Sequence, residues 1–271
     1  MEPGALHVGR YGTAGPWVVV VHGGPGAPGE MAPVARGLAD SFRVLEPWQR
    51  PRGGEPLTVA RHVEDLHEVV LRHCGGARPG VVGHSWGAML ALAYAAAHPA
   101  EAGPLVLIGC GTFDKAARSR LRQTLDARTH DRLRRRLDRI AEEFPDPGQR
   151  MLEQQKASET LYLYDPDDIE EPADEGPLDP RGHAETWNDM LRLQEEGVYP
   201  AAFAAIRSPV LMVHGAYDPH PGGMIRAGLQ PYIPHLEYCE WERCGHDPWR
   251  ERGARDAFFK ALRDWLGRRL G

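Results

Sequence analysis

The chain has 271 residues, a length that suits one α/β domain carrying an insertion. Hydrophobic residues make up 42% and charged residues 26%, as in an ordinary soluble globular protein, and a net charge of -6 without a basic–aromatic stripe argues against nucleic-acid binding. No apolar run approaches the length of a membrane span, and the first residues lack the basic and apolar regions of a secretion signal, so we expect a cytoplasmic protein with no membrane partner.

The first part of the chain alternates apolar runs with helical patterns. Residues 17–21 form a continuous apolar run, typical of a strand buried on both faces of a parallel sheet, and the run leads into the Gly/Pro-rich segment 22–26. The alternation predicts right-handed parallel crossovers, and therefore a doubly wound, mostly parallel sheet. We expect further strands at 42–45, 80–83 and 105–108, and helices at 31–40, 57–73 and 86–98.

The alternation then stops for almost ninety residues. Apolar positions from Ala117 to Phe144 are spaced as in one long amphipathic helix with a kink near Thr129. Prolines at 145 and 147 are expected to end this helix. A second helix is expected at 183–196. We interpret this region as a helical cap inserted into the core, which gives the boundaries 113–200 for the cap and 1–112 and 201–271 for the core.

The strand and helix patterns resume at Pro209. We expect strands at 210–213 and 236–241 and helices at 222–229 and 253–266. The four cysteines show no Cys-x-x-Cys spacing, which makes a zinc site unexpected, and we expect free thiols: Cys74, Cys110, Cys239 and Cys244.

A serine stands where a strand pattern meets a helix pattern. Ser85 lies in the pentapeptide Gly-His-Ser-Trp-Gly, directly after an apolar pair and before an Ala-rich run. A sharp strand-to-helix turn exposes such a serine, and the glycines on either side remove the Cβ atoms that would clash there. The pattern predicts that Ser85 is a nucleophile.

A serine hydroxyl needs a base, and the base needs an orienting acid. The loops after two later strands supply His246 and Asp218, in the chain order Ser, Asp, His that is expected for such a sheet. We predict His246 as general base and Asp218 as its acid partner. Weaker candidates are His220 and His214 for the base and Asp114 for the acid, while Asp247 more naturally caps a helix or binds backbone.

Two backbone N–H groups are predicted to form an oxyanion hole. One belongs to Trp86 at the start of the helix, and the other to Gly24, since Pro25 has no N–H. No metal or nucleotide motif is found, because Gly53-Gly54 has no lysine after it.

Together these residues resemble the serine α/β-hydrolase superfamily over 5–112 and 200–268. Within it, the segment 22–26 paired with Ser85-Trp86-Gly87 looks most like the prolyl aminopeptidase (proline iminopeptidase) group. The resemblance implies the α/β-hydrolase fold, removal of an N-terminal proline from peptides, and acidic cap side chains that hold the free amine.

Two positions depart from that group's pattern. Its members usually carry Asp-Gln-Arg-Gly-x-Gly-x-Ser after the second core strand, whereas here 46–54 reads Glu-Pro-Trp-Gln-Arg-Pro-Arg-Gly-Gly. His84 stands before the serine where the group often has glycine. The candidates for the amine-binding acids are Glu185 and Asp189, which flank Trp187 on a predicted cap helix.

We therefore expect a serine hydrolase, without metal or cofactor, that cleaves a small amide or ester through an acyl-enzyme. Trp48, Trp86 and Trp187 are the candidate apolar walls for its small-molecule or short-peptide substrate. Prolyl-aminopeptidase-like activity and carboxylesterase or lactonase activity both stay open. The alternative from a different class is a non-catalytic, hydrolase-like ligand-binding protein. Dehalogenase or epoxide-hydrolase chemistry would need an aspartate at position 85.

Overall fold

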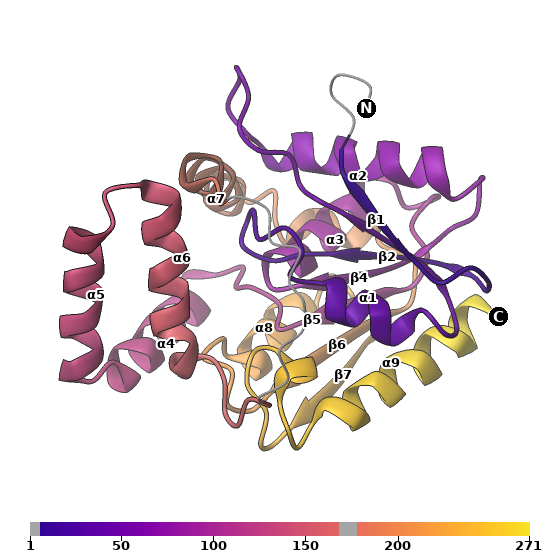
Figure 1. The fold of residues 1–271 in the computed structure, drawn as a ribbon. Helices are drawn as coiled ribbons and strands as arrows, with labels where there is room; N and C mark the ends of the chain where they lie inside the picture. The colour runs from indigo at the N-terminus through magenta and orange to yellow at the C-terminus, as the bar shows by residue number, and fades with distance from the viewer. Residues whose placement is uncertain (1–5, 168–177) are drawn as a thin grey trace.

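The computed structural model describes residues 6–167 and 178–271. Its centre is a seven-stranded sheet with the order β1-β3-β2-β4-β5-β6-β7, parallel throughout except for the antiparallel β1–β3 pair at one edge (Figure 1). The doubly wound, mostly parallel sheet predicted from the sequence is confirmed. The strands are β1 (Val8–Tyr11), β2 (Trp17–Val21), β3 (Arg43–Pro47), β4 (Gly80–His84), β5 (Leu105–Ile108), β6 (Val210–Gly215) and β7 (Leu236–Trp241).

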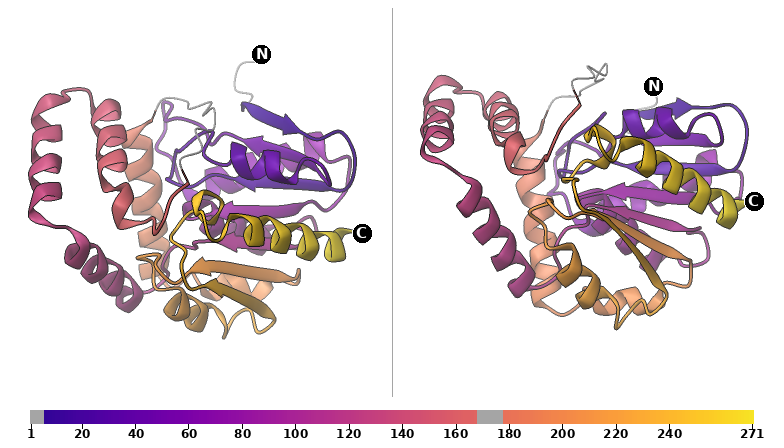
Figure 2. Two further views of the ribbon diagram at one scale, coloured as in Figure 1. Left: turned by 60° about the horizontal axis from the view of Figure 1, so that its bottom comes forward. Right: turned by 90° about the horizontal axis from the view of Figure 1, so that it is seen from below.

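Helices cover both faces of the sheet, which explains the continuous apolar strands. In β2, Val19 and Val21 face one hydrophobic layer while Val18 and Val20 face the other. Complete burial of one such side chain is worth about 1.5–3 kcal/mol, so both faces stabilise the sheet. Figure 2 shows the two layers of helices. One layer contains α2 (Val59–His73), α3 (Trp86–Ala97) and α8 (Gly222–Leu229), and the other α1 (Ala32–Leu38) and α9 (Arg255–Leu270).

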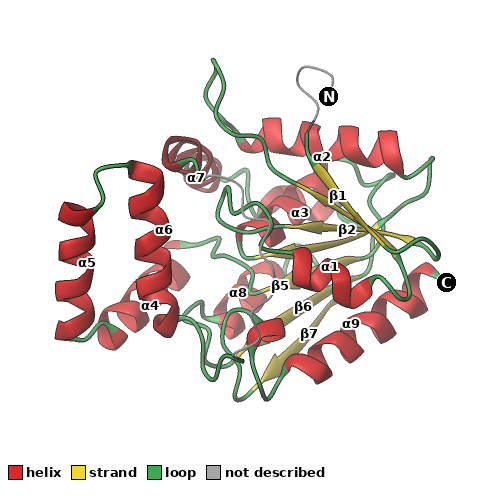
Figure 3. Ribbon diagram, in the orientation of Figure 1, coloured by secondary structure: helices red, strands yellow, loops and turns green. Residues whose placement is uncertain are grey.

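A group of helices is inserted between β5 and β6. Of the four α-helices in the described parts of this insertion, α4, α5 and α6 stand to one side of the sheet, and α7 runs close to α2 (Figure 3). One arginine connects the group to the core: Arg128 donates to the carbonyl oxygens of Leu161 at 2.5 Å and Tyr217 at 2.7 Å. The inserted helices are α4 (Lys115–Arg128), α5 (Asp131–Glu143), α6 (Pro147–Ser158) and α7 (Pro180–Glu195), and short 3₁₀ helices lie at Glu159–Leu161, Ala201–Ala205 and Pro248–Arg250.

The expectation of one long helix from Ala117 to Phe144 is wrong. The backbone is extended at Thr129 and His130, and the His130 imidazole accepts the N–H of Leu133 at 3.2 Å, so a second helix starts there. The sequence analysis also missed α6. Pro147 lies in its first turn, where a missing N–H costs nothing, and Asp146 caps it by accepting the N–H of Gln149.

Strand β1 was also missed, because this edge strand is only partly buried and contains Gly9 and Arg10 in place of an apolar run. Within residues 6–167 and 178–271, no helix is long and apolar enough to cross a membrane.

Candidate active site

Ser85 occupies a strained turn between β4 and α3. Its φ is +52° and its ψ is -114°, and in the described ranges it is the one residue other than glycine with a positive φ. Such a conformation costs about 1–3 kcal/mol and persists only where its surroundings hold it. Here the Ser85 N–H donates to the carbonyl oxygen of Ile108 at 2.8 Å. Ser85 thus lies at the sharp strand-to-helix turn that the motif indicated.

The glycines flanking this turn have no room for a side chain. A Cβ atom on Gly83 would lie 2.2 Å from the carbonyl oxygen of Gly87, and one on Gly87 would lie 2.2 Å from that of Val21. Both obstacles are backbone atoms, which cannot swing aside. The glycine spacing therefore follows from the close approach of α3 to the strands beneath it.

His246 and Asp218 come together from the loops after β7 and β6. Nδ1 of His246 lies 2.7 Å from Oδ2 of Asp218, whose side chain has no exposed surface. The His246 ring is also 4.5 Å from that of His84, the residue before Ser85. The three chain-distant loops singled out in the sequence therefore meet at one edge of the sheet.

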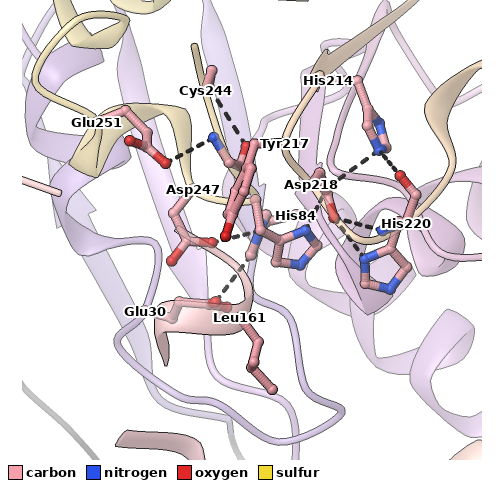
Figure 4. Close-up of polar contacts among 12 residues, drawn as sticks. Glu30, His84, Leu161, His214, Tyr217, Asp218, His220, Cys244, Asp247 and Glu251 are labelled. Carbon is pink, nitrogen blue, oxygen red and sulfur yellow. Dashed lines mark hydrogen bonds and ion pairs between the residues drawn. The ribbon is translucent and has the colours of Figure 1, made fainter. Parts of the chain in front are cut away.

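Asp218 contacts two further histidines (Figure 4). Nδ1 of His220 lies 2.9 Å from Oδ1, and Nε2 of His214 lies 3.2 Å from Oδ2. Burial alone would raise the pKa of the Asp218 carboxyl, but the attraction of His246, His220 and His214 outweighs it and holds this pKa well below 3.8. Burial lowers the pKa of His220, whose ring is stacked 4.7 Å from that of His246. The two weaker histidine candidates are thus partners of the acid.

Glu251, which the sequence analysis missed, supports the His246 loop. It has no exposed surface, and its carboxylate accepts the N–H groups of Gly245, Tyr164 and Asp165, each at 2.7 Å. Three backbone donors on one buried acid fix the loop to the segment that follows α6. Only its closeness in sequence to His246 pointed to Glu251.

The loop after β2 passes directly beside Ser85. A Cβ atom on Gly23 would lie 3.3 Å from the Cβ of Ser85. Gly24 has a φ of +108°, a conformation that favours glycine. Within the described part of the chain, the N–H groups of Gly24 and Trp86 donate no hydrogen bond to the protein. Both predicted oxyanion donors are therefore free to donate.

Gln49 links this loop to the serine turn. Its N–H donates to Nε2 of His22 at 2.9 Å, and its Oε1 accepts Nε1–H of Trp86 at 3.0 Å. The Trp86 side chain is 1% exposed, so it packs in the core and does not form a substrate wall.

Residues 18–261 match the family described as "Alpha/beta hydrolase family". The chain belongs to this family. It is 25% identical over 283 residues to the 2-hydroxy-6-oxononadienedioate/2-hydroxy-6-oxononatrienedioate hydrolase of Cupriavidus pinatubonensis, covering 97% of this chain and 90% of that protein.

Solved structures of other hydrolases share the fold. The enol-lactonase from Burkholderia xenovorans LB400 is 20% identical with a TM-score of 0.61, covering 97% of this chain and 96% of the other. A thermophilic esterase from Thermogutta terrifontis is 18% identical with a TM-score of 0.65, covering 98% and 94%. The predicted superfamily is confirmed, whereas none of these relatives is a prolyl aminopeptidase.

A cleft of about 210 Å³ opens beside the loop after β2, in which an oxyanion donor was predicted. Pro25 and Gly26 from that loop line it together with Trp48, and Thr186 lines it from α7. Trp48 thus lies where a substrate wall was predicted, with its ring 4.2 Å from that of His7. Trp187 is not among the lining residues, since it packs edge-on to Trp86 at 6.5 Å.

The ionised side chains along the cleft already have partners. The guanidinium of Arg50 donates to both oxygens of Asp65 at 2.5 Å. Asp179 accepts the N–H groups of Arg52 at 2.6 Å and Gly182 at 3.0 Å. The charge of Arg50 is therefore paired, and both carboxylate oxygens of Asp179 already accept a hydrogen bond.

The two acids proposed to hold a substrate amine are engaged by the protein itself. Glu185 accepts Nε–H of Arg52 at 2.6 Å and the N–H of Leu57 at 3.0 Å. Asp189 accepts the N–H of Val59 at 2.8 Å and pairs with Arg192 at 2.7 Å. Both carboxylates thus fasten α7 to the start of α2. Glu185 has no oxygen left without a partner, so its predicted role as a substrate-binding acid is not supported.

Among the residues that the structure describes, two sets of three side chains have possible metal-ligand atoms within 4.8 Å of one another: Asp218, His220 and His246, and His84, His246 and Asp247. Each set is held by the contacts between its own members, and we assign neither to a metal. All four cysteines are free thiols.

Proposed function

We propose that the protein is a serine hydrolase in which Ser85, His246 and Asp218 act as the catalytic triad. The observation that carries this proposal is the 2.7 Å contact between His246 and the fully buried Asp218, beside a strained serine turn. A binding protein without turnover would need neither the strain nor the paired imidazole. The geometry therefore favours an enzyme over the ligand-binding alternative.

Each residue has a defined role in the proposed reaction. Oγ of Ser85 attacks the substrate carbonyl carbon while Nε2 of His246 takes its proton. The anionic Asp218 accepts Nδ1–H and stabilises the imidazolium that forms. The N–H groups of Gly24 and Trp86 donate to the carbonyl oxygen as it becomes negative. His246 then protonates the leaving group, and water releases the acyl group from Ser85 by the reverse proton path.

The favoured substrate is a small ester or lactone with an uncharged group in the cleft. The walls of the cleft include Trp48, Leu57 and Pro25. The ionised residues of the cleft, Arg50 and Asp179, already have hydrogen-bond partners in the protein. The lactonase and esterase that share the fold agree with this choice. A prolyl-aminopeptidase-like activity is the less favoured alternative, because Glu185 and Asp189 are not free to bind an amine. Function in the cytoplasm without a cofactor stays a prediction.

A fluorophosphonate probe tests the triad. Wild-type protein should be labelled and turn over an acyl-ester reporter, and Ser85→Ala should do neither. Equal labelling of the two proteins would refute the nucleophile. A proline-amide reporter run in parallel separates the two substrate classes: faster cleavage of the amide than of neutral esters would reverse our preference.

A further inference from the structure

A buried histidine that the proposed reaction does not use lies behind the serine turn. His84 is 1% exposed, with Nδ1 2.9 Å from Oε1 of Glu30 and Nε2 3.3 Å from Oδ1 of Asp247 (Figure 4). Neither contact has hydrogen-bond alignment, so the attraction between the imidazole and the two carboxylates is mainly electrostatic. We call these three residues the charge clamp.

Each charged group of the clamp stabilises the ionised form of its partners. Burial alone would lower the pKa of His84, but Glu30 and Asp247 outweigh it and raise this pKa to about 10. Burial would likewise raise the pKa values of both carboxyls, but His84 keeps each of them lowered. Arg250, 3.5 Å from Asp247, adds a second positive charge, and the His246 ring lies alongside. At pH 7 the clamp is a cation held between two anions.

Each member of the clamp is joined to a different part of the active site. Oε2 of Glu30 accepts the N–H of Gly23, next to the oxyanion donor Gly24, at 2.6 Å. His84 is bonded to the nucleophile Ser85, and Asp247 to the base His246. The clamp thus connects, through one buried contact set, the three loops whose relative positions the reaction requires.

We propose that Glu30, His84 and Asp247 position the oxyanion loop and the His246 loop against the Ser85 turn, and that His84 is the positioning residue at their centre. This inference rests on the proposed serine-hydrolase function. It assigns a role to His84, which stands before Ser85 where the prolyl aminopeptidase group often has glycine. A misplacement of about 1 Å among reacting groups can cost about 100-fold in rate, so loss of the clamp should lower kcat more than it weakens substrate binding.

The test measures kcat and KM on a neutral ester in wild type and variants. It also compares the rates at which a fluorophosphonate probe labels these proteins. We expect His84→Gln to lower kcat by about 10- to 100-fold with KM changed less than about twofold. Glu30→Gln keeps an oxygen for the N–H of Gly23 and loses only the charge, so a drop of about 3- to 10-fold is expected. Because the residues act as one unit, the double variant should lose less than the product of the two single losses.

His67→Gln is the matched control. His67 is a partly buried histidine on α2 that stacks on His98, about 20 Å along α3 from Ser85. It should leave kcat unchanged. A kcat within twofold of wild type for His84→Gln, or an equal loss in His67→Gln, would overturn the inference, as would losses that multiply independently.

Two further outcomes keep the inference and the proposed function apart. Wild-type protein without labelling or turnover would refute the function itself. If His84→Gln does not fold, by circular dichroism and Tm, then Glu30→Gln and Asp247→Asn decide the matter, and unchanged kcat in both would refute the clamp.

Discussion

The serine turn and the inserted helices differ sharply in how tightly they are packed. Around Ser85, an added Cβ would meet backbone at 2.2 Å, and ten of the twelve residues of α3 are buried. On α6, by contrast, no residue is buried, and α5 buries only Leu133 and Ile140. The proposed chemistry is thus concentrated where the backbone leaves no freedom, whereas we expect α5 and α6 to tolerate surface changes without disturbing it.

The sharpest test of the tightly packed region is Asp218→Asn. An amide cannot hold His246 in the required tautomer or stabilise its cation, so kcat should fall about 10⁴-fold. The measurement is steady-state turnover of a neutral ester. If kcat fell less than tenfold while the fold stayed intact, Asp218 would not be the acid of the catalytic triad.

Gly87→Ala should unfold or severely destabilise the protein, by about 3 kcal/mol or more, because its Cβ would meet the Val21 carbonyl at 2.2 Å. Urea denaturation measures the effect. Gly267→Ala in α9 is the matched control: nothing lies within 4 Å of its Cβ, and alanine should stabilise that helix by about 0.5–1 kcal/mol. Similar effects of the two changes would contradict the packing comparison.

The charge clamp predicts a loss of stability in alkali. The pKa of His84 is raised from 6.5 to about 10, so its contribution is complete below pH 6.5 and disappears as pH rises through 10. One pKa unit corresponds to about 1.4 kcal/mol, so the free energy of unfolding of wild type should be a few kcal/mol higher than that of His84→Gln at pH 6. Urea unfolding from pH 6 to 10 should show this difference shrinking. A difference independent of pH would mean that His84 is neutral.

The smallest effects are expected in the cap. Glu185→Gln weakens the contacts of α7 with Arg52 and Leu57, which should lower the Tm slightly while KM for neutral esters and for proline amides stays unchanged. A raised KM confined to the amide would restore Glu185 as an amine-binding residue. Arg135→Ala, on the exposed face of α5, is the control and should change stability by less than about 0.5 kcal/mol.

The sequence predicted the tightly packed region well and the cap poorly, for physical reasons. Two-sided burial imposes runs such as Val18 to Val21, and the close turn imposes its glycines, so both leave clear patterns. The kink expected near Thr129 is a complete break, and this break and the start of α6 at Pro147 depend on local capping, which amphipathic spacing does not reveal. Glu30 and Glu251 act through contacts with distant or irregular backbone, and no motif marks them.

The guanidinium of Arg128 has a mechanical consequence. It donates hydrogen bonds to the carbonyl oxygen of Leu161, on the cap side, and to that of Tyr217, the neighbour of Asp218. It also stacks 3.7 Å from the centre of the Tyr217 ring. An outward movement of α4 would have to break both hydrogen bonds and this stacking contact, beside the residue that precedes Asp218. We therefore expect α4 to keep its place when substrate enters.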